Sequence, residues 1–189
     1  MTRYLFSLLI LFATSVTIHG QGYWSESITL PGSTIRNFHQ IDSGVYRSGQ
    51  PDQVDFKALE AFGIQEVLNL RNFHNDKDEA EGTSLVLHHV RINAFSINKK
   101  QLIKAMRIIK DRKGPVLIHC LHGSDRTGAV IALYRMLFQQ VPKEEAIREM
   151  KEGGFGHHSI FFNITRTLEK IDIDEVRNEL GIGASAVNR

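Results

Sequence analysis

One stretch of the chain, residues 116–128, constrains the fold more than any other. It reads VLIHCLHGSDRTG: a run of apolar and β-branched residues leads into the only cysteine, and a short polar loop follows. The residues after that loop, TGAVIALYR, carry apolar side chains at helical spacing. The stretch therefore predicts a strand, a loop and a helix in direct succession.

The loop of this stretch has the features of an anion-binding site. The first N–H groups of a helix lack intrahelical acceptors and lie at the positive end of the helix dipole, so the loop can hold a phosphate-like dianion. The same field favours the thiolate form of Cys120. Arg126 offers a planar guanidinium that can bind two phosphate oxygens at once, and Gly123 allows the backbone to turn inward. A nucleophile, an anion cradle and a clamp thus lie close together in the sequence.

The same residues resemble those of a known family. Cys120, five intervening residues, Arg126 and Thr127 match the C-x5-R-[ST] signature of the cysteine-dependent phosphatases. The fuller pattern HCxxGxDRTG, together with YRSGQP at residues 46–51, resembles the bacterial relatives of the dual-specificity (tyrosine/serine) phosphatases. The resemblance covers about residues 38–171.

The order of the expected elements predicts an α/β fold. Short apolar runs alternate with amphipathic segments before a helical tail, which favours a mainly parallel central sheet flanked by helices on both faces. The resemblance implies the same arrangement, a dual-specificity-like cysteine-phosphatase fold. Residues 72–83 (NFHNDKDEAEGT) have no apolar rhythm and are expected to form a mobile loop with solvated carboxylates. We expect strands at 38–41, 45–47, 64–70, 85–92 and 116–119, and helices at 52–63, 102–112, 127–139, 144–152, 160–171 and 174–180.

The N-terminal residues differ in kind from the rest. Arg3 precedes a mostly apolar stretch, Tyr4 to Ile18, which is too short for a comfortable membrane span and is typical of a secretory signal peptide. We therefore expect a signal peptide at residues 1–22 and a single phosphatase domain at residues 23–189. The protein would be exported, to the periplasm or outside the cell; an N-terminal membrane anchor that stays attached is the alternative.

The net charge limits which partners are expected, and the single cysteine excludes an internal disulfide. A formal net charge of +2 is too small to indicate a nucleic-acid partner or a charged membrane surface, and no stable membrane insertion is expected once the signal is cleaved. A single cysteine cannot form an internal disulfide, so Cys120 would remain a free thiol even in an oxidising compartment.

The resemblance implies a reaction that needs neither a metal nor a cofactor. The Cys120 thiolate would attack the phosphorus of a bound phosphate ester and form a cysteinyl-phosphate, which water would then hydrolyse. Arg126 would clamp the phosphate, and Thr127 would hydrogen-bond the thiolate or, alternatively, cap the helix. The substrate would also contact the interior of the loop, namely Leu121, His122, Gly123 and Ser124.

Two further residues have expected supporting roles. His119, directly before the nucleophile, would be buried and orient the loop. Arg71 follows the strand at 64–70, whose end should emerge beside the end of the strand at 116–119, where ligands of α/β sheets bind. Arg71 is therefore a candidate substrate contact, with a solvated loop arginine as the alternative.

The source of the proton for the leaving group departs from the family pattern. Most of these phosphatases take it from an aspartate in a loop before the signature, expected here at residues 93–98, but that segment reads NAFSIN and has no carboxylate. Asp125 is the nearest acid, at a position where myotubularin-like and Sac-type lipid phosphatases also carry aspartate. A bound phosphate would favour its protonated form. Asp125 could instead orient the loop, and the other candidates are His157, His158, Asp76 and Asp78.

The expected substrate is a phosphorylated protein, at tyrosine or serine, or a small phosphoester. The loop interior has no Lys or Arg, unlike the loops of inositol-lipid phosphatases, so a highly charged inositol phosphate is not favoured. Two other functions fit the pattern less well. One is a rhodanese-like sulfurtransferase, whose cysteine also follows a strand, and the other is a phosphate-binding module without catalysis.

Overall fold

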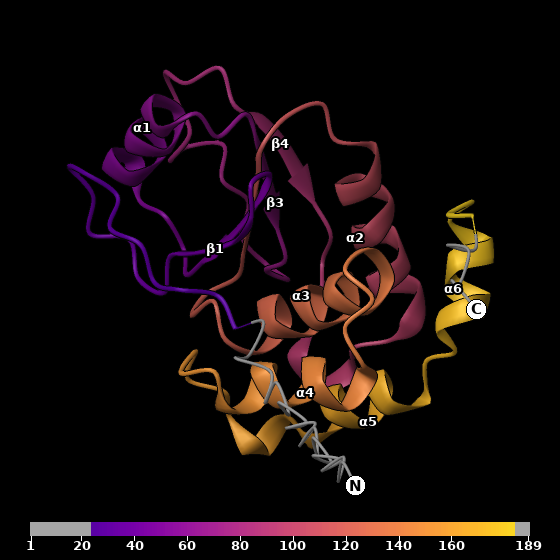
Figure 1. The fold of residues 1–189 in the computed structure, drawn as a ribbon. Coiled ribbons are helices and arrows are strands. Elements are labelled where there is room, and N and C mark those ends of the chain that lie inside the picture. Colours follow the sequence, from indigo (N-terminus) through magenta and orange to yellow (C-terminus); the bar gives the residue numbers. More distant parts are fainter. Residues whose placement is uncertain (1–23, 184–189) are drawn as a thin grey trace, which may run out of the picture.

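The structure, a computed structural model, describes residues 24–183 of the chain. Its centre is a five-stranded sheet in the order β1-β2-β5-β3-β4, with helices packed on either side (Figure 1). The expected signal peptide at residues 1–22 lies outside the described residues. The strands are β1 (His39–Asp42), β2 (Val45–Ser48), β3 (Glu66–Asn69), β4 (Val86–His89) and β5 (Val116–His119).

The sheet is parallel except at one edge, as expected. β1 and β2 form an antiparallel hairpin, whereas β2, β5, β3 and β4 run parallel. In this register Ser48 of β2 and Asn69 of β3 both lie opposite His119 of β5. The carboxyl ends of three strands therefore meet at one edge of the sheet, immediately before Cys120.

Helices cover both faces of the sheet unequally. α1 packs on one face and the remaining α-helices gather on the other (Figure 1). Alternate residues of β5 point to opposite sides, with Leu117 in the α1 cluster and Ile118 in the larger one. The helices are α1 (Gln53–Phe62), α2 (Lys99–Asp111), α3 (Asp125–Phe138), α4 (Lys143–Glu152), α5 (Phe162–Lys170) and α6 (Ile173–Glu179), with short 3-10 turns η1 (Ala94–Ser96) and η2 (Ser159–Phe161).

α3 is the central helix and carries the functional loop at its start. Its side chains are buried along nearly its whole length, because α2, α4 and α5 surround it on the side away from the sheet. A helix that is apolar on all sides is typical of a protein core. The loop that precedes α3 is thereby attached to the most rigidly packed element of the molecule.

The ends of the helices agree with the sequence where capping residues define them. Asp52 caps α1 and exchanges hydrogen bonds with Asp55, and Gly63 ends the helix with a φ of 104°. α2 begins at Lys99, earlier than expected, because Asn98 accepts a hydrogen bond from the Gln101 N–H and caps it. α3 likewise begins earlier, at Asp125, so that Arg126 and Thr127 lie in its first turn. No helix within residues 24–183 is long and apolar enough to cross a membrane.

Candidate active site

The loop between β5 and α3 places its residues around Cys120. The cysteine directly follows β5 and is 2% exposed, at the foot of the loop. Within the described residues, the backbone N–H groups of residues 122–126 donate to no protein acceptor. They remain available to an anion, as expected for the loop and first turn at the start of a helix.

Gly123 is the residue that lets this loop close against the sheet. Its φ is +75°, and a Cβ built there would lie 2.5 Å from the carbonyl carbon and oxygen of Ser48 at the end of β2. A side chain would therefore force the loop away from β2. The sequence expectation of an inward turn at this glycine is confirmed.

A second arginine, Arg47, lies beneath the loop. It is 1% exposed, its Nη2 donates to the Gly123 carbonyl oxygen at 2.6 Å, and its guanidinium carbon lies 3.6 Å from the centre of the Phe155 ring. Burial lowers the pKa of Arg47 to about 10, while the negative charges of Glu149 and Cys120 act in the opposite direction. Arg47 is thus a buried cation close to the nucleophile at neutral pH. The YRSGQP pattern contained it, but nothing local in that pattern indicated that β2 would bring it under the loop.

Thr127 lies in the first turn of α3 and is fully buried. The alternative that it caps the helix is wrong, because Ser124 occupies the N-cap position. The Thr127 hydroxyl has no hydrogen-bond partner among the described residues. That leaves it free to interact with the thiolate or with a bound phosphate.

His119 is fully buried and fixes the end of β5. Its Nε2 lies 2.8 Å from Oδ2 of Asp76, and its Nδ1 lies 3.3 Å from the Cys120 carbonyl oxygen. Asp76 also accepts hydrogen bonds from the side chains of Asn69 and Gln50. The expectation that the carboxylates of residues 72–83 are all solvated is therefore wrong for Asp76, which is 4% exposed. The loop folds back so that this carboxylate pairs with three side chains, two of them buried.

This environment also bears on the candidates for the general acid. Burial raises the pKa of Asp76, but the hydrogen bond and charge of His119, the hydrogen bond from Gln50 and the charge of His74 outweigh burial and hold the pKa below its usual value. A carboxyl group with a lowered pKa is a poor proton donor at neutral pH. Asp78, the other candidate in this loop, is exposed and lines neither pocket beside the active-site loop.

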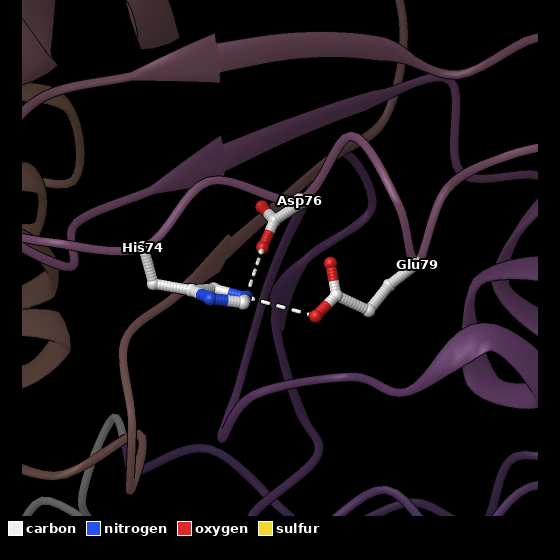
Figure 2. Close-up of side chains that lie close together, drawn as sticks. All are labelled: His74, Asp76 and Glu79. Carbon is white, nitrogen blue, oxygen red and sulfur yellow. Dashed lines mark ion pairs between the residues drawn. The ribbon is translucent and has the colours of Figure 1, made fainter.

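The loop that carries Asp76 also contains a cluster able to hold a cation. His74 lies between two carboxylates, with its Nε2 3.0 Å from Glu79 and 3.9 Å from Asp76 (Figure 2). Within residues 24–183 this is the one group of three such side chains close enough to share a metal ion. In this structure Asp76, the buried member of the cluster, accepts hydrogen bonds from Gln50 and Asn69 and contacts His119, which ties the cluster to the end of β5.

Asp125 connects the active-site loop to the segment after α4. Its side chain is buried, and its two oxygens accept hydrogen bonds from the His158 backbone N–H at 2.9 Å and from His158 Nδ1 at 2.8 Å. His157 Nδ1 lies 3.1 Å from the same carboxylate. The structure thus brings together three of the residues proposed separately as proton donors.

Further hydrogen bonds fasten the same segment to the loop. Ser124 Oγ donates to the Phe155 carbonyl oxygen at 2.6 Å. Asn37 Nδ2 donates hydrogen bonds to the carbonyl oxygens of His122 and Phe155, at 3.1 and 2.9 Å. Ser124 therefore serves the loop's packing in this structure.

A pocket beside Arg126 has a volume of about 420 Å³. Arg71 and Leu121 line it, as expected for substrate contacts, and the side chain of Arg71 is held by a 3.0 Å hydrogen bond to Gln50 Oε1. The 93–98 segment lies at this pocket, as expected for the family's acid loop, but contributes Asn93, Ala94 and Phe95 rather than a carboxylate. Sequence reasoning missed its aromatic walls, which are Phe73, Phe95 and Phe161.

A second pocket, of about 430 Å³, lies on the other side of Leu121. His122 and Ser124 line it, together with Phe155 and Gln50. The loop residues expected to contact substrate are therefore divided between two pockets, with Leu121 bordering both.

Comparison with known proteins agrees with this geometry. Residues 34–176 match the model of the tyrosine phosphatase family. The dual specificity protein phosphatase TpbA of Pseudomonas aeruginosa (strain UCBPP-PA14) is 27% identical over 157 residues, which are 81% of this chain and 71% of that protein. The inositol diphosphatase DSP1 of Oryza sativa subsp. japonica is 33% identical over 112 residues, covering 53% of this chain and 50% of that protein.

Solved structures show the same fold. The crystal structure of P. aeruginosa TpbA matches with a TM-score of 0.75 at 24% identity, covering 85% of this chain and 98% of that one. The core catalytic domain of the PP-IP phosphatase SIW14 from S. cerevisiae matches with a TM-score of 0.65 at 25% identity, covering 77% and 91%. From the matched model, which spans the loop, the sheet and the helices around them, we conclude that the chain belongs to the tyrosine phosphatase family.

Proposed function

We propose that this protein hydrolyses phosphate monoesters through a cysteinyl-phosphate intermediate formed on Cys120. One observation carries the proposal: the buried cysteine directly precedes the loop that opens α3, with Arg47 buried beneath that loop and Arg126 in the first turn of the helix. The two arginines and the free N–H groups favour binding of the dianionic phosphate that the Cys120 sulfur attacks.

The reaction has two steps. The Cys120 sulfur attacks phosphorus in line with the ester oxygen, while Arg126 and the loop N–H groups hold the equatorial oxygens. Water then attacks the cysteinyl-phosphate and releases inorganic phosphate. The free hydroxyl of Thr127 supports its assignment to the second step, in which it stabilises the thiolate as it leaves phosphorus. No metal takes part in this scheme, and full activity in the presence of EDTA is the expected result.

The pocket favours an aryl phosphate as substrate. Phe73, Phe95 and Phe161 line the pocket that Arg126 borders, and an aromatic ring packs well against such walls. A related structure, P. aeruginosa TpbA with a cysteine-to-serine substitution, was solved in complex with pTyr. Other relatives are named inositol diphosphatases. Within residues 121–125 this chain offers no Lys or Arg for additional phosphate groups, which supports phosphotyrosine over an inositol diphosphate.

The test compares substrates and one variant. Wild-type protein should hydrolyse p-nitrophenyl phosphate and a phosphotyrosine peptide, and Cys120→Ser should abolish both activities. Acid quench of the wild-type enzyme should trap phosphate on Cys120, detectable by mass spectrometry. Membership of a phosphatase family disfavours sulfur transfer. Thiocyanate production from thiosulfate and cyanide, without phosphatase activity, would restore that alternative.

We also propose that the chain is exported after removal of residues 1–22. The basic Arg3 followed by about fifteen mostly apolar residues supports this. N-terminal sequencing of the protein recovered from the periplasm should begin near residue 23. Recovery of full-length chain from the membrane fraction would favour the retained anchor instead.

A further inference from the structure

We propose that His158 is the proton donor to the leaving group and that Asp125 positions it. This inference rests on the proposed phosphatase function and supplies the group that the 93–98 segment lacks. It assigns the acid to an Asp–His pair, one member from the loop and the other from the segment after α4.

The hydrogen bonds define the orientation of the imidazole. Asp125 accepts from the backbone N–H of His158 and from its Nδ1, which fixes both the main chain and the ring. With Nδ1 engaged, Nε2 is the ring nitrogen left to exchange a proton. A carboxylate that holds one imidazole nitrogen sets the direction of the other.

The ring lies beside the active-site loop, next to the pocket bordered by Arg126 rather than among its lining residues. Its centroid is 5.5 Å from the ring of His122 in the active-site loop and 6.1 Å from Phe161, which lines that pocket. The His158 side chain is 49% exposed, which leaves the ring accessible to a leaving group that extends past Phe161 toward solvent.

The neighbouring titratable groups fit this role less well. Asp125 has a buried side chain whose oxygens face His157 and His158, so they are directed at the two histidines rather than at a leaving group. His157 faces the same carboxylate, but its side chain is only 7% exposed. His122, the third titratable group beside His158, has no ring nitrogen paired with a carboxylate among the described residues, so no acidic group orients its ring.

The proton balance is complete without a further reactant. In the first step the sulfur–phosphorus bond forms and the ester bond breaks, and the imidazolium Nε2 gives its proton to the departing oxygen. Neutral His158 then accepts a proton from the attacking water as the sulfur–phosphorus bond breaks. Phosphate leaves, and the thiolate and the imidazolium are restored.

The decisive variant is His158→Asn, because an asparagine amide can donate to Asp125 in place of Nδ1 while carrying no exchangeable acid. The matched control is His157→Asn, next in the chain and facing the same carboxylate. Each is assayed for kcat/KM, from pH 5 to 9, with phenyl phosphate, which has a poor leaving group, and with 2,4-dinitrophenyl phosphate, which has a good one. Thermal unfolding confirms that both variants fold.

His158→Asn should lower kcat/KM for phenyl phosphate by about 10²-fold, a typical contribution of general acid catalysis. It should leave kcat/KM for the dinitrophenyl ester within about threefold of the wild-type value. It should also remove the fall of kcat/KM at high pH. His157→Asn should change neither. Asp125→Asn should cause a smaller loss of the same kind, and the double variant with His158→Asn should be no worse than His158→Asn alone, because the pair acts as a unit.

Two results would overturn the inference while leaving the proposed function intact. One is a His158→Asn variant in which the ratio of kcat/KM for the two aryl phosphates equals that of the wild type. The other is loss of the high-pH limb in Asp125→Asn but not in His158→Asn, which would assign the proton to the carboxyl group. Hydrolysis of dinitrophenyl phosphate that persists in Cys120→Ser would instead contradict the proposed function itself.

Discussion

Oδ2 of Asp76 lies 2.8 Å from Nε2 of His119, and both side chains are almost completely buried behind the nucleophile. The contact joins a polar loop to the last residue of β5 across 43 positions of sequence. The geometry of the active-site loop therefore depends on a carboxylate that does not line the substrate pocket.

Replacing Asp76 with asparagine should therefore destabilise the protein. A hydrogen bond to a charged group contributes about 1.5–3 kcal/mol, and the substitution removes that charge. Urea unfolding at pH 7 measures the loss. Asp78→Asn, an exposed change in the same loop, is the control and should leave the free energy of unfolding unaltered.

The same pair predicts how stability depends on pH. The folded-state pKa of Asp76 lies below the ordinary value of 3.8, because the hydrogen bond and charge of His119 outweigh burial. The stabilisation is therefore complete at pH values above 3.8 and is lost as the pH falls through the lower folded value. In urea titrations, the gap between wild type and Asp76→Asn should stay constant from pH 7 to pH 5 and narrow below pH 3.8. A gap that widens with acid would contradict the assignment.

Gly123→Ala should disable the active-site loop. The position combines a φ of +75° with a contact of 2.5 Å between the added Cβ and the backbone of Ser48. Gly154→Ala is a matched control, since its φ is +80° but a Cβ there meets nothing within 4 Å. Both variants should lose roughly 1 kcal/mol from the backbone strain. Only Gly123→Ala should also lose most of its activity toward p-nitrophenyl phosphate. Equal activities of the two variants would show that the added Cβ does not displace the loop from Ser48.

Arg47→Met should shift the ionisation of the nucleophile. Removing a buried cation near Cys120 disfavours the thiolate, so the rate of alkylation by iodoacetamide should reach its midpoint at higher pH than in wild type. Arg47→Lys keeps the charge but loses the planar contact with Phe155, and should shift the midpoint less. Coincident alkylation profiles for Arg47→Met and wild type would show that Arg47 only packs.

Phe95→Ala should weaken the binding of aryl substrates. Phe95 lines the pocket and packs edge-on against Phe161 with ring centres 4.8 Å apart. An aromatic contact contributes about 0.5–1.5 kcal/mol, so KM for a phosphotyrosine peptide should rise about two- to tenfold with kcat little changed. Phe162→Ala removes a comparably exposed ring outside the pocket and should leave KM unchanged.

The elements that sequence reasoning predicted well are those specified by neighbouring residues. The strand at 116–119, the helix between Asp52 and Gly63 and the hairpin before it depend on apolar spacing, caps and a turn within a few positions. The start of α3 was placed two residues late: Ser124, a residue type common at helix N-caps, holds that position without a side-chain cap hydrogen bond.

By itself, the sequence determined the chemistry at the centre of the site: a thiol, an anion-binding loop and an arginine on one strand–loop–helix unit, because these are contiguous. The tertiary structure decided the surroundings. Parallel pairing of β2 with β5 carried Arg47 beneath the loop, the fold of the 72–83 loop buried Asp76 against His119, and the segment after α4 returned to place His158 on Asp125. Each of these contacts joins residues more than thirty positions apart, and only the packing of the whole chain around α3 brings such distant groups within hydrogen-bond range.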